Sequence, residues 1–282
     1  MHYSRLKSMI KTRFVWGAIF ALLLVVGMTS VSAQRYFAGE KLYYRAAYRA
    51  KLVPNTEVGE VSVITKLEVV DGKESYRVTG NGRTLPFYRW AFDMNDTYNI
   101  WVDKHSLRTY RFESDLKEDE YTFRSYYSYD WDAKTVYTWS QRRKESPKER
   151  TLALTPTSMD AVSLYFNLRS IDLKSFREGE ELVLDLVLED TIRHLRYRYI
   201  ARERVKVPKL GYFDTMKFAC TIGSSEEFSF TDGSEFFIWI TNDENKIPVM
   251  LASPIRIGEV RLYLDKYEGL HYPLISRQTK DN

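Results

Sequence analysis

The 282-residue chain carries 42 Lys and Arg residues against 38 Asp and Glu residues, and 44% of its residues are hydrophobic. Four of the basic residues and none of the acidic ones fall in residues 1–33, so the rest of the chain has 38 of each sign and is formally neutral. A neutral chain offers no general electrostatic attraction to nucleic acid or to an anionic surface. Nucleic acid is therefore excluded as an expected partner.

Residues 1–33 have the layout of a secretory signal peptide. Basic residues precede the apolar run 14–28, and Val31 and Ala33 supply the small residues before a cut ahead of Gln34. An uncleaved anchor is the alternative, but the run is short for a membrane span. No cysteine follows the predicted cut, which closes the lipoprotein route. We expect cleavage between Ala33 and Gln34 and export to the periplasm of a Gram-negative bacterium.

Residues 34–282 are predicted to form a single β-rich domain, since all-β domains of this length are often one unit. Cys220 is the only cysteine, so the domain cannot contain an internal disulfide and must rely on packing. A lone cysteine inside a strand-like segment is expected to be a small buried hydrophobic residue.

The first half of the chain has the pattern of a meander of half-buried antiparallel strands. From Lys41 to Leu52 the even positions are apolar and most odd positions are larger and polar, as in a strand with one buried face. Asp71-Gly72 predicts a tight turn between two such segments. The strands predicted before residue 121 are 41–52, 61–69, 74–82, 98–103 and 108–114.

An aromatic hairpin is predicted over residues 121–140. By strand parity, one face carries a stripe that continues after a break at 132–134; the stripe is Tyr121, Phe123, Tyr127, Tyr129, Trp131, Tyr137 and Trp139. The rings could fill a concave interior, line an apolar cavity for an acyl chain, or present a platform to a glycan or a protein. The candidate ligand-binding residues are Tyr127, Tyr129, Trp131, Tyr137 and Trp139.

Two charged runs flank this hairpin. The acidic run 113–120 resembles an exposed loop, although paired carboxylates for glycoside cleavage are an alternative. The basic run 141–150 is balanced by Glu145 and Glu149 and is predicted to be a solvated turn, with contact to lipid headgroups as the alternative.

One main α-helix is predicted near residues 157–170, because Thr157 and Asp160 have capping-box spacing and Met159, Val162 and Phe166 fall near one face. Strands are predicted to resume at 180–190, 195–207, 213–222, 236–242 and 259–269. The expected fold is mainly β, with one large curved antiparallel sheet or partly closed β-barrel that the helix plugs or covers.

Catalytic and metal-binding patterns are missing from the sequence. His105, His194 and His271 are far apart and have no metal-ligand spacing. No nucleophile motif or phosphate-binding glycine loop occurs, and Ser163 has no local base, so a hydroxyl beside the helix cap Asp160 is the simpler interpretation. We expect no enzymatic activity, no metal site and no cofactor.

The predicted helix and the last third of the chain resemble the exported bacterial family named domain of unknown function 3108. The resemblance rests on three motifs, which comprise Asp160, Ser163, Phe166 and Arg169 in the helix, Gly211, Phe213, Asp214 and Thr215 in a turn, and Trp239, Asp243 and Pro248 around a strand. It implies an envelope-associated β-rich protein without an assigned reaction, and a structural role for these residues. By fold analogy, the plan is similar to the half-barrels of periplasmic lipoprotein carriers.

The expected function is a non-catalytic periplasmic protein that binds a lipid or another apolar or amphiphilic envelope molecule in a concave aromatic-lined face. The first alternative is a module that binds a glycan or an envelope protein through the same rings on an outer face. An envelope hydrolase is a third alternative, and would need distant catalytic groups brought together. The sequence leaves the oligomeric state open.

Overall fold

The structure is a computed structural model that describes residues 37–51, 53–70, 72–160, 165, 166, 169, 176–188, 190–223, 235–255 and 257–278. The predicted leader 1–33 and its cleavage site at Ala33 and Gln34 lie outside the described residues. The strands are β1 (Lys41–Ala50), β2 (Val53–Val70), β3 (Lys73–Thr84), β4 (Asn95–Asp103), β5 (Thr109–Glu118), β6 (Tyr121–Asp130), β7 (Thr135–Arg142), β8 (Lys148–Ala153), β9 (Ser158–Met159), β10 (Glu181–Leu188), β11 (Thr191–Val207), β12 (Gly211–Ile222), β13 (Glu235–Thr241), β14 (Pro248–Pro254), β15 (Glu259–Glu268) and β16 (Arg277–Gln278).

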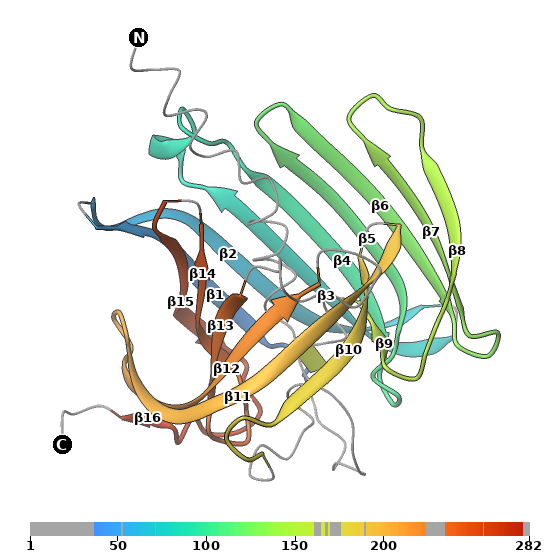
Figure 1. Ribbon diagram of the computed structural model, residues 1–282. Helices are drawn as coiled ribbons and strands as arrows, with labels where there is room; N and C mark the ends of the chain where they lie inside the picture. Colours follow the sequence, from blue (N-terminus) through green and yellow to red (C-terminus); the bar gives the residue numbers. More distant parts are fainter. Residues whose placement is uncertain are drawn as a thin grey trace.

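All sixteen strands belong to one sheet. The order of neighbouring strands is β8-β7-β6-β5-β4-β3-β2-β1-β15-β14-β13-β12-β11-β10-β9, and β16 pairs with β12. Neighbouring strands are antiparallel, apart from the short parallel pair of β9 with β10. Figure 1 shows two arms, β2 to β8 and β15 to β10, that curve toward each other from β1. The edge strands β8 and β9 do not pair with each other, so the predicted large curved sheet is confirmed but it is not a closed barrel.

Alternating side chains explain why these segments form a sheet around a core. In β1, Leu42, Tyr44 and Ala46 are fully buried, whereas Tyr43 and Arg45 on the opposite face are only partly buried. The same alternation places apolar side chains of both arms in one continuous cluster. Burial of this apolar surface is the main favourable contribution to folding.

The curvature has local causes. The pairing register of β1 shifts beside Tyr44 and again beside Ala47, and that of β11 shifts between Tyr199 and Ala201. Such bulges bend a strand and increase its twist. At the β14–β15 turn, Gly258 has φ +87°, and a Cβ there would lie 2.2 Å from the Arg49 carbonyl oxygen. Only glycine allows this turn to lie against β1.

The predicted helix at 157–170 is wrong at its start, because Ser158 and Met159 form β9 and pair with β10. The expected cap pairing of Thr157 with Asp160 is replaced by a turn, in which Thr157 donates to the Asp185 carboxylate. Of residues 161–175, the structure describes Tyr165, Phe166 and Arg169, which have helical backbone. Elsewhere in the described ranges no α-helix is found, and none of the described helical residues forms a segment long and apolar enough to cross a membrane.

Candidate functional site

Strand β6 turns an aromatic face toward the core. Phe123, Tyr127 and Tyr129 are buried and alternate with exposed polar residues. The Tyr127 ring stacks on Phe112 of β5, with 4.6 Å between the ring centroids and 9° between the planes. All of these rings except Phe123 are part of the continuous core cluster. The predicted face of β6 is confirmed.

Trp131 lies at the end of this stripe, in the β6–β7 turn. Its ring stacks on Tyr129 at 5.8 Å, and its indole Nε1 donates to the Thr109 carbonyl oxygen at 2.7 Å. The Arg108 guanidinium lies 4.8 Å from the ring centroid. The buried Tyr129 hydroxyl has no hydrogen-bond partner within the described part of the chain. Trp131 therefore closes the stripe at one end of the hairpin.

The prediction that Tyr137 and Trp139 continue the inner stripe is wrong. On β7 the buried side chains are Val136, Thr138 and Ser140, while Tyr137 is 36% exposed and Trp139 is partly exposed on the outer face. The reason is the four-residue turn 131–134, since Asp130 pairs with Thr135. An odd and an even position thus face each other across the hairpin, and the inner parity changes from odd to even.

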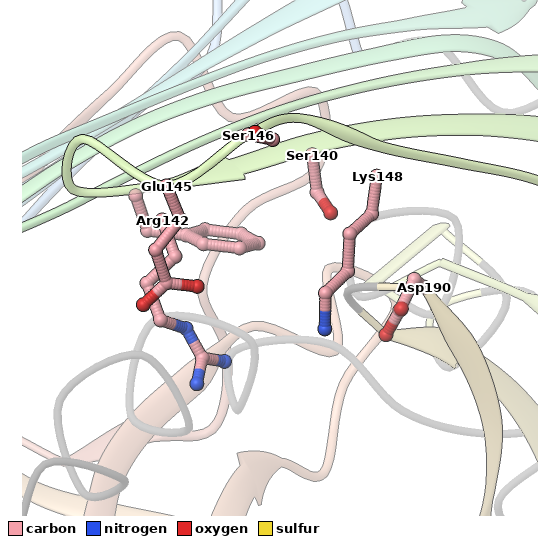
Figure 2. Close-up of a pocket in the computed structure, with 7 residues that line it drawn as sticks. Ser140, Arg142, Glu145, Ser146, Lys148 and Asp190 are labelled. Atoms are coloured by element: carbon pink, nitrogen blue, oxygen red, sulfur yellow. The ribbon is translucent and has the colours of Figure 1, made fainter.

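A small pocket lies where the polar ends of β6, β7 and β8 meet the β10–β11 turn (Figure 2). Its cavity volume is about 20 Å³, which is room for about one water molecule, and it is open to solvent on one side. Arg142 and Lys148 extend to the same side with the Ser140 hydroxyl between them, and Asp190 lies opposite them in the β10–β11 turn (Figure 2). Its remaining lining residues are Phe123, Glu145 and Ser146.

The pocket lies beside the seam between the edge strand β8 and the β10–β11 hairpin. Arg150 of β8 reaches across this seam, with its Nε 3.5 Å from an Asp190 carboxylate oxygen. Near the other end, residues 154–157 connect β8 to β9, and the Asp185 amide donates to the Thr157 carbonyl oxygen. Both edges also carry partly buried leucines, Leu152 and Leu188. Among the described residues, the seam near the pocket is thus bridged by the exposed Arg150–Asp190 ion pair rather than by strand pairing.

A layer of serines extends from the pocket along the inner face. Ser114, Ser125 and Ser140 are in register on β5, β6 and β7, all three are buried, and the hydroxyls of Ser114 and Ser125 are hydrogen bonded at 2.7 Å. Small hydroxyl side chains here replace the large rings of the next layer, Phe112 and Tyr127. The interior therefore has a polar layer between the rings of Phe112 and Tyr127 and the apolar pair of Leu116 and Phe123 at the pocket end.

Two buried carboxyl groups lie at the same end of the sheet. Burial raises the pKa of Asp96 to about 8, assisted by the charge of Glu118 and opposed by a hydrogen bond from the Lys117 amide. Burial likewise raises the pKa of Glu118 to about 7, with a contribution from Asp119. One oxygen of Asp96 accepts no hydrogen bond from the described residues. Near neutral pH Asp96 is therefore largely protonated and Glu118 is protonated to about half, unlike ordinary carboxylates.

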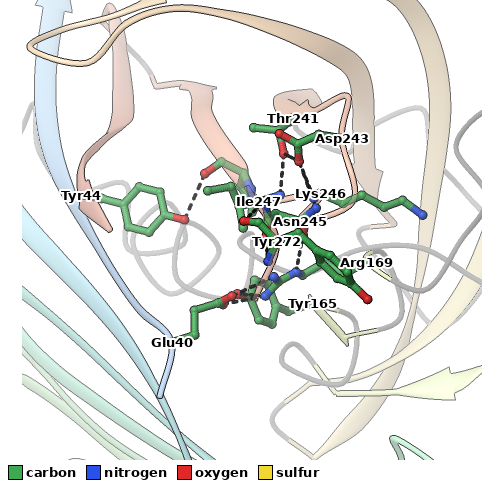
Figure 3. A network of polar contacts seen from close by, with 11 residues as sticks. Glu40, Tyr44, Tyr165, Arg169, Thr241, Asp243, Asn245, Lys246, Ile247 and Tyr272 are labelled. Atoms are coloured by element: carbon green, nitrogen blue, oxygen red, sulfur yellow. Dashed lines mark hydrogen bonds and ion pairs between the residues drawn. The ribbon is translucent and has the colours of Figure 1, made fainter. Parts of the chain in front are cut away.

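A buried ion pair joins the start of the sheet to Arg169 (Figure 3). The Arg169 guanidinium binds both Glu40 oxygens at 2.6 and 2.8 Å and donates from Nε to the Asn245 carbonyl oxygen at 2.7 Å. The Tyr165 hydroxyl bonds to both charged partners. The structural role that the resemblance implies for Arg169 is thus a buried ion pair, and sequence reasoning missed its carboxylate partner Glu40.

The other resemblance residues also make structural contacts. Asp243 accepts hydrogen bonds from Thr241 and the Asn245 amide (Figure 3). It also accepts one from Ser276, and the Pro248 carbonyl oxygen accepts one from Tyr44. Burial disfavours ionisation of Asp214, but hydrogen bonds from Arg202 and Asn242 outweigh it and lower the pKa of Asp214. Asp160 and Phe166 are buried, and Gly211 has φ +94°. The Trp239 indole donates to Glu203. Ser163 lies outside the described residues.

The cysteine and a histidine of the described ranges have the following surroundings. Cys220 is buried, and burial raises the pKa of its thiol well above the ordinary value. The structure brings His194 within 2.9 Å of an Asp185 oxygen, a pair that the sequence did not indicate. The nearby Thr155 hydroxyl bonds to Asp185, not to the imidazole. No cluster of three metal-ligating side chains occurs among the described residues.

Sequence reasoning missed the pocket residues Arg142, Lys148 and Asp190. The only indication was the alternative that the basic run 141–150 contacts lipid headgroups. The acidic run 113–120 was interpreted as an exposed loop, and this is wrong, because it continues β5 as far as the buried Glu118.

Comparison with known proteins agrees with the fold. A family model described as "Protein of unknown function (DUF3108)" matches residues 43–265. The chain is also similar to a crystal structure of a β-barrel-like protein of the domain of unknown function DUF1849 from Brucella abortus, with TM-score 0.53 and 13% identity over 82% of this chain and 97% of that chain. At this identity the similarity concerns the fold alone. No curated protein matches the chain significantly.

Proposed function

Since this chain belongs to the DUF3108 family, whose description names no reaction, we propose from its own geometry that it is a non-catalytic binding protein of the cell envelope. In this proposal it holds an amphiphile with an anionic headgroup at the seam between β8 and the β10–β11 hairpin. The leader predicted in residues 1–33 supports the location in the periplasm, and the basic pocket beside an apolar core supports the class of ligand.

The observation that best supports this proposal is that charged side chains lie next to apolar surface at the seam. Arg142 and Lys148 line the pocket together with the Ser140 hydroxyl, and Arg150 lies next to it across from Asp190. With Glu145 and Asp190 counted, three cations face two carboxylates. Guanidinium and ammonium groups bind phosphate oxygens by charge-assisted hydrogen bonds. The headgroup is therefore expected to be phosphate-like rather than neutral.

The hydrocarbon part of such a ligand has a matching surface. Phe123 lines the pocket and lies one inner layer from the serines, while Leu152 and Leu188 flank the seam and pack against the core. The edge strands are not held together by backbone hydrogen bonds at this point. In this proposal an acyl chain enters between β8 and β10 and packs against these leucines, which removes apolar surface from water.

Isothermal titration with dodecyl phosphate below its micellar concentration tests the proposal. We expect saturable binding, and a loss of roughly a hundredfold or more in affinity for Arg142→Ala/Lys148→Ala, because each of the two charged contacts contributes about 1.5–3 kcal/mol. Lys144→Ala in the same turn is the matched control and should bind as the wild type does. Dodecyl maltoside, which has the same alkyl chain but a neutral headgroup, measures the contribution of the chain. Inorganic phosphate measures the contribution of the headgroup. Equal affinity of the double variant and the wild type would contradict the proposal.

A second candidate function is glycan binding on the outer face. Tyr126, Tyr137 and Trp139 lie on that face, with Tyr126 and Trp139 directly opposite each other, and Tyr137 is 36% exposed. Aromatic rings on a sheet can stack on sugar rings. Titration with soluble fragments of envelope glycans tests this candidate, which requires saturable binding that Trp139→Ala abolishes.

A further inference from the structure

The loop between β3 and β4 presents two large aromatic rings to solvent. Phe87 is 75% exposed and Trp90 is 62% exposed, and both lie in the segment 85–92, which includes the short 3₁₀ turn Pro86–Tyr88. Single apolar residues on a surface are common. Two exposed aromatic rings three positions apart on one turn instead form a small apolar prominence, which is typical of an interaction site.

This prominence is held in place at both ends. At its start the Leu85 amide donates to the Val58 carbonyl oxygen at 2.9 Å, and at its exit the Asp93 amide donates to the Asp119 side chain at 2.9 Å. Within the loop, the Ala91 amide donates to the Tyr88 carbonyl oxygen at 3.0 Å. The backbone that carries the exposed rings is therefore preorganised, so that little backbone entropy is lost when the loop binds.

The chemistry of the segment matches the interfacial region of a phospholipid membrane. Residues 85–92 read LPFYRWAF and contain one charged side chain, Arg89, and no carboxylate. Trp and other aromatic rings concentrate at the level of lipid headgroups, and arginine binds phosphate well. Arg89 pairs with Asp93 at 3.5 Å, but both side chains are exposed, and such surface pairs contribute little. Exchange of Asp93 for a lipid phosphate is therefore easy.

The loop lies at the same end of the molecule as the seam pocket. In an antiparallel sheet, turns that follow alternate strands lie at one end, so the β3–β4 loop and the β7–β8 turn share an end (Figure 1). A membrane that contacts Phe87 and Trp90 would lie at the end to which the pocket belongs.

We propose that residues 85–92 dock this protein reversibly on a phospholipid membrane surface, with Phe87 and Trp90 inserted among the headgroups and Arg89 bound to lipid phosphate. This goes beyond amphiphile binding and rests on a different part of the molecule. Flotation with vesicles of phosphatidylethanolamine and a minority of phosphatidylglycerol tests it. Intact mass first establishes where the purified protein begins. Only protein without the apolar leader is used, because the leader could itself bind the vesicles.

Phe87→Ser/Trp90→Ser should reduce the vesicle-bound fraction at least tenfold, and Arg89→Glu severalfold. Val69→Ser and Ile275→Ser, which change apolar residues that are 67% and 75% exposed elsewhere, should bind as the wild type does. Circular dichroism checks that the variants fold. No binding by the wild type, or equal binding by the double variant, would overturn the proposal. Self-association that the double variant loses without any vesicle binding would instead assign the loop to a second copy of the chain. Titration with dodecyl phosphate should be unchanged in the double variant, which separates docking from amphiphile binding.

Discussion

The Arg169 side chain joins segments that lie far apart in the sequence. Its guanidinium contacts Glu40 before β1, Tyr165 and the Asn245 carbonyl oxygen in the β13–β14 turn. Glu40 and Arg169 are only 3% and 4% exposed, so each charge depends on the other for solvation. A buried pair of this kind adds little compared with apolar packing, but the loss of one partner leaves an uncompensated charge.

Glu40→Gln should therefore lower the free energy of unfolding by about 3 kcal/mol, because the amide cannot compensate the guanidinium. Urea denaturation measures this change. Glu60→Gln, which alters a more exposed carboxylate paired with Arg45 and Arg83, is the control and should change stability by less than about 1 kcal/mol. A similar small effect at Glu40 would contradict the role assigned to the pair.

The raised pKa of the buried Asp96 carboxyl leads to a prediction of how stability depends on pH. Its pKa of about 8 in the folded protein lies above the ordinary value of 3.8, so the folded state binds more protons than the unfolded state between these values. Stability therefore falls as pH rises from about 4 to 8. Asp96→Asn removes this dependence and should stabilise the protein at pH 9 by at least about 1.4 kcal/mol, the equivalent of one pKa unit.

Thermal or urea unfolding of Asp96→Asn at several pH values provides the check. Glu120→Gln changes a carboxyl in the neighbouring exposed turn and should leave the pH profile unaltered. A profile for Asp96→Asn that is parallel to that of the wild type would show that the Asp96 carboxyl is not retained in its protonated form.

At the scale of the element, the β6–β7 hairpin shows how one turn decides which rings are inside. The turn 131–134 has an even number of residues, so the inner face changes parity between the two strands. Tyr127 packs on Phe112, whereas Tyr137 lies on the outer face opposite Ser128. The two tyrosines are ten positions apart in one hairpin but have different environments.

Tyr127→Ala should destabilise the protein by about 3–5 kcal/mol, as expected for removal of a buried aromatic ring. Tyr137→Ala in the same hairpin should change the free energy of unfolding by less than about 1 kcal/mol. Chemical denaturation of both variants measures the difference. Equal losses would contradict the register described here.

The sequence predicted much of the fold through local patterns. Alternation located the strand that contains Leu42, Tyr44 and Ala46, and parity identified the inner face of β6. It failed where the decisive information was not local. The parity change at β7 depends on the length of a turn, and β9 depends on pairing with β10, which lies further along the chain. The partner of Arg169 lies 129 positions away, and no spacing rule connects it to Glu40.

At the scale of the whole molecule, β1 pairs with β15 and so joins two arms of one open sheet. The arms meet again at the seam, where Arg150 and Asp190 form an ion pair and the pocket lies between β8 and the β10–β11 turn. The candidate site was only partly foreseen, because its residues come from strands at the two ends of the sheet order. Tyr127 and Tyr129 belong to the core cluster behind it.

Native mass spectrometry of the protein isolated gently from its own envelope tests the central claim most directly. The account predicts that the wild type carries a co-purifying anionic amphiphile, visible as a discrete mass increase, and that Arg142→Ala/Lys148→Ala loses it while Lys144→Ala retains it. A wild-type protein that is consistently free of any such mass, and that also fails to bind dodecyl phosphate, would contradict the account.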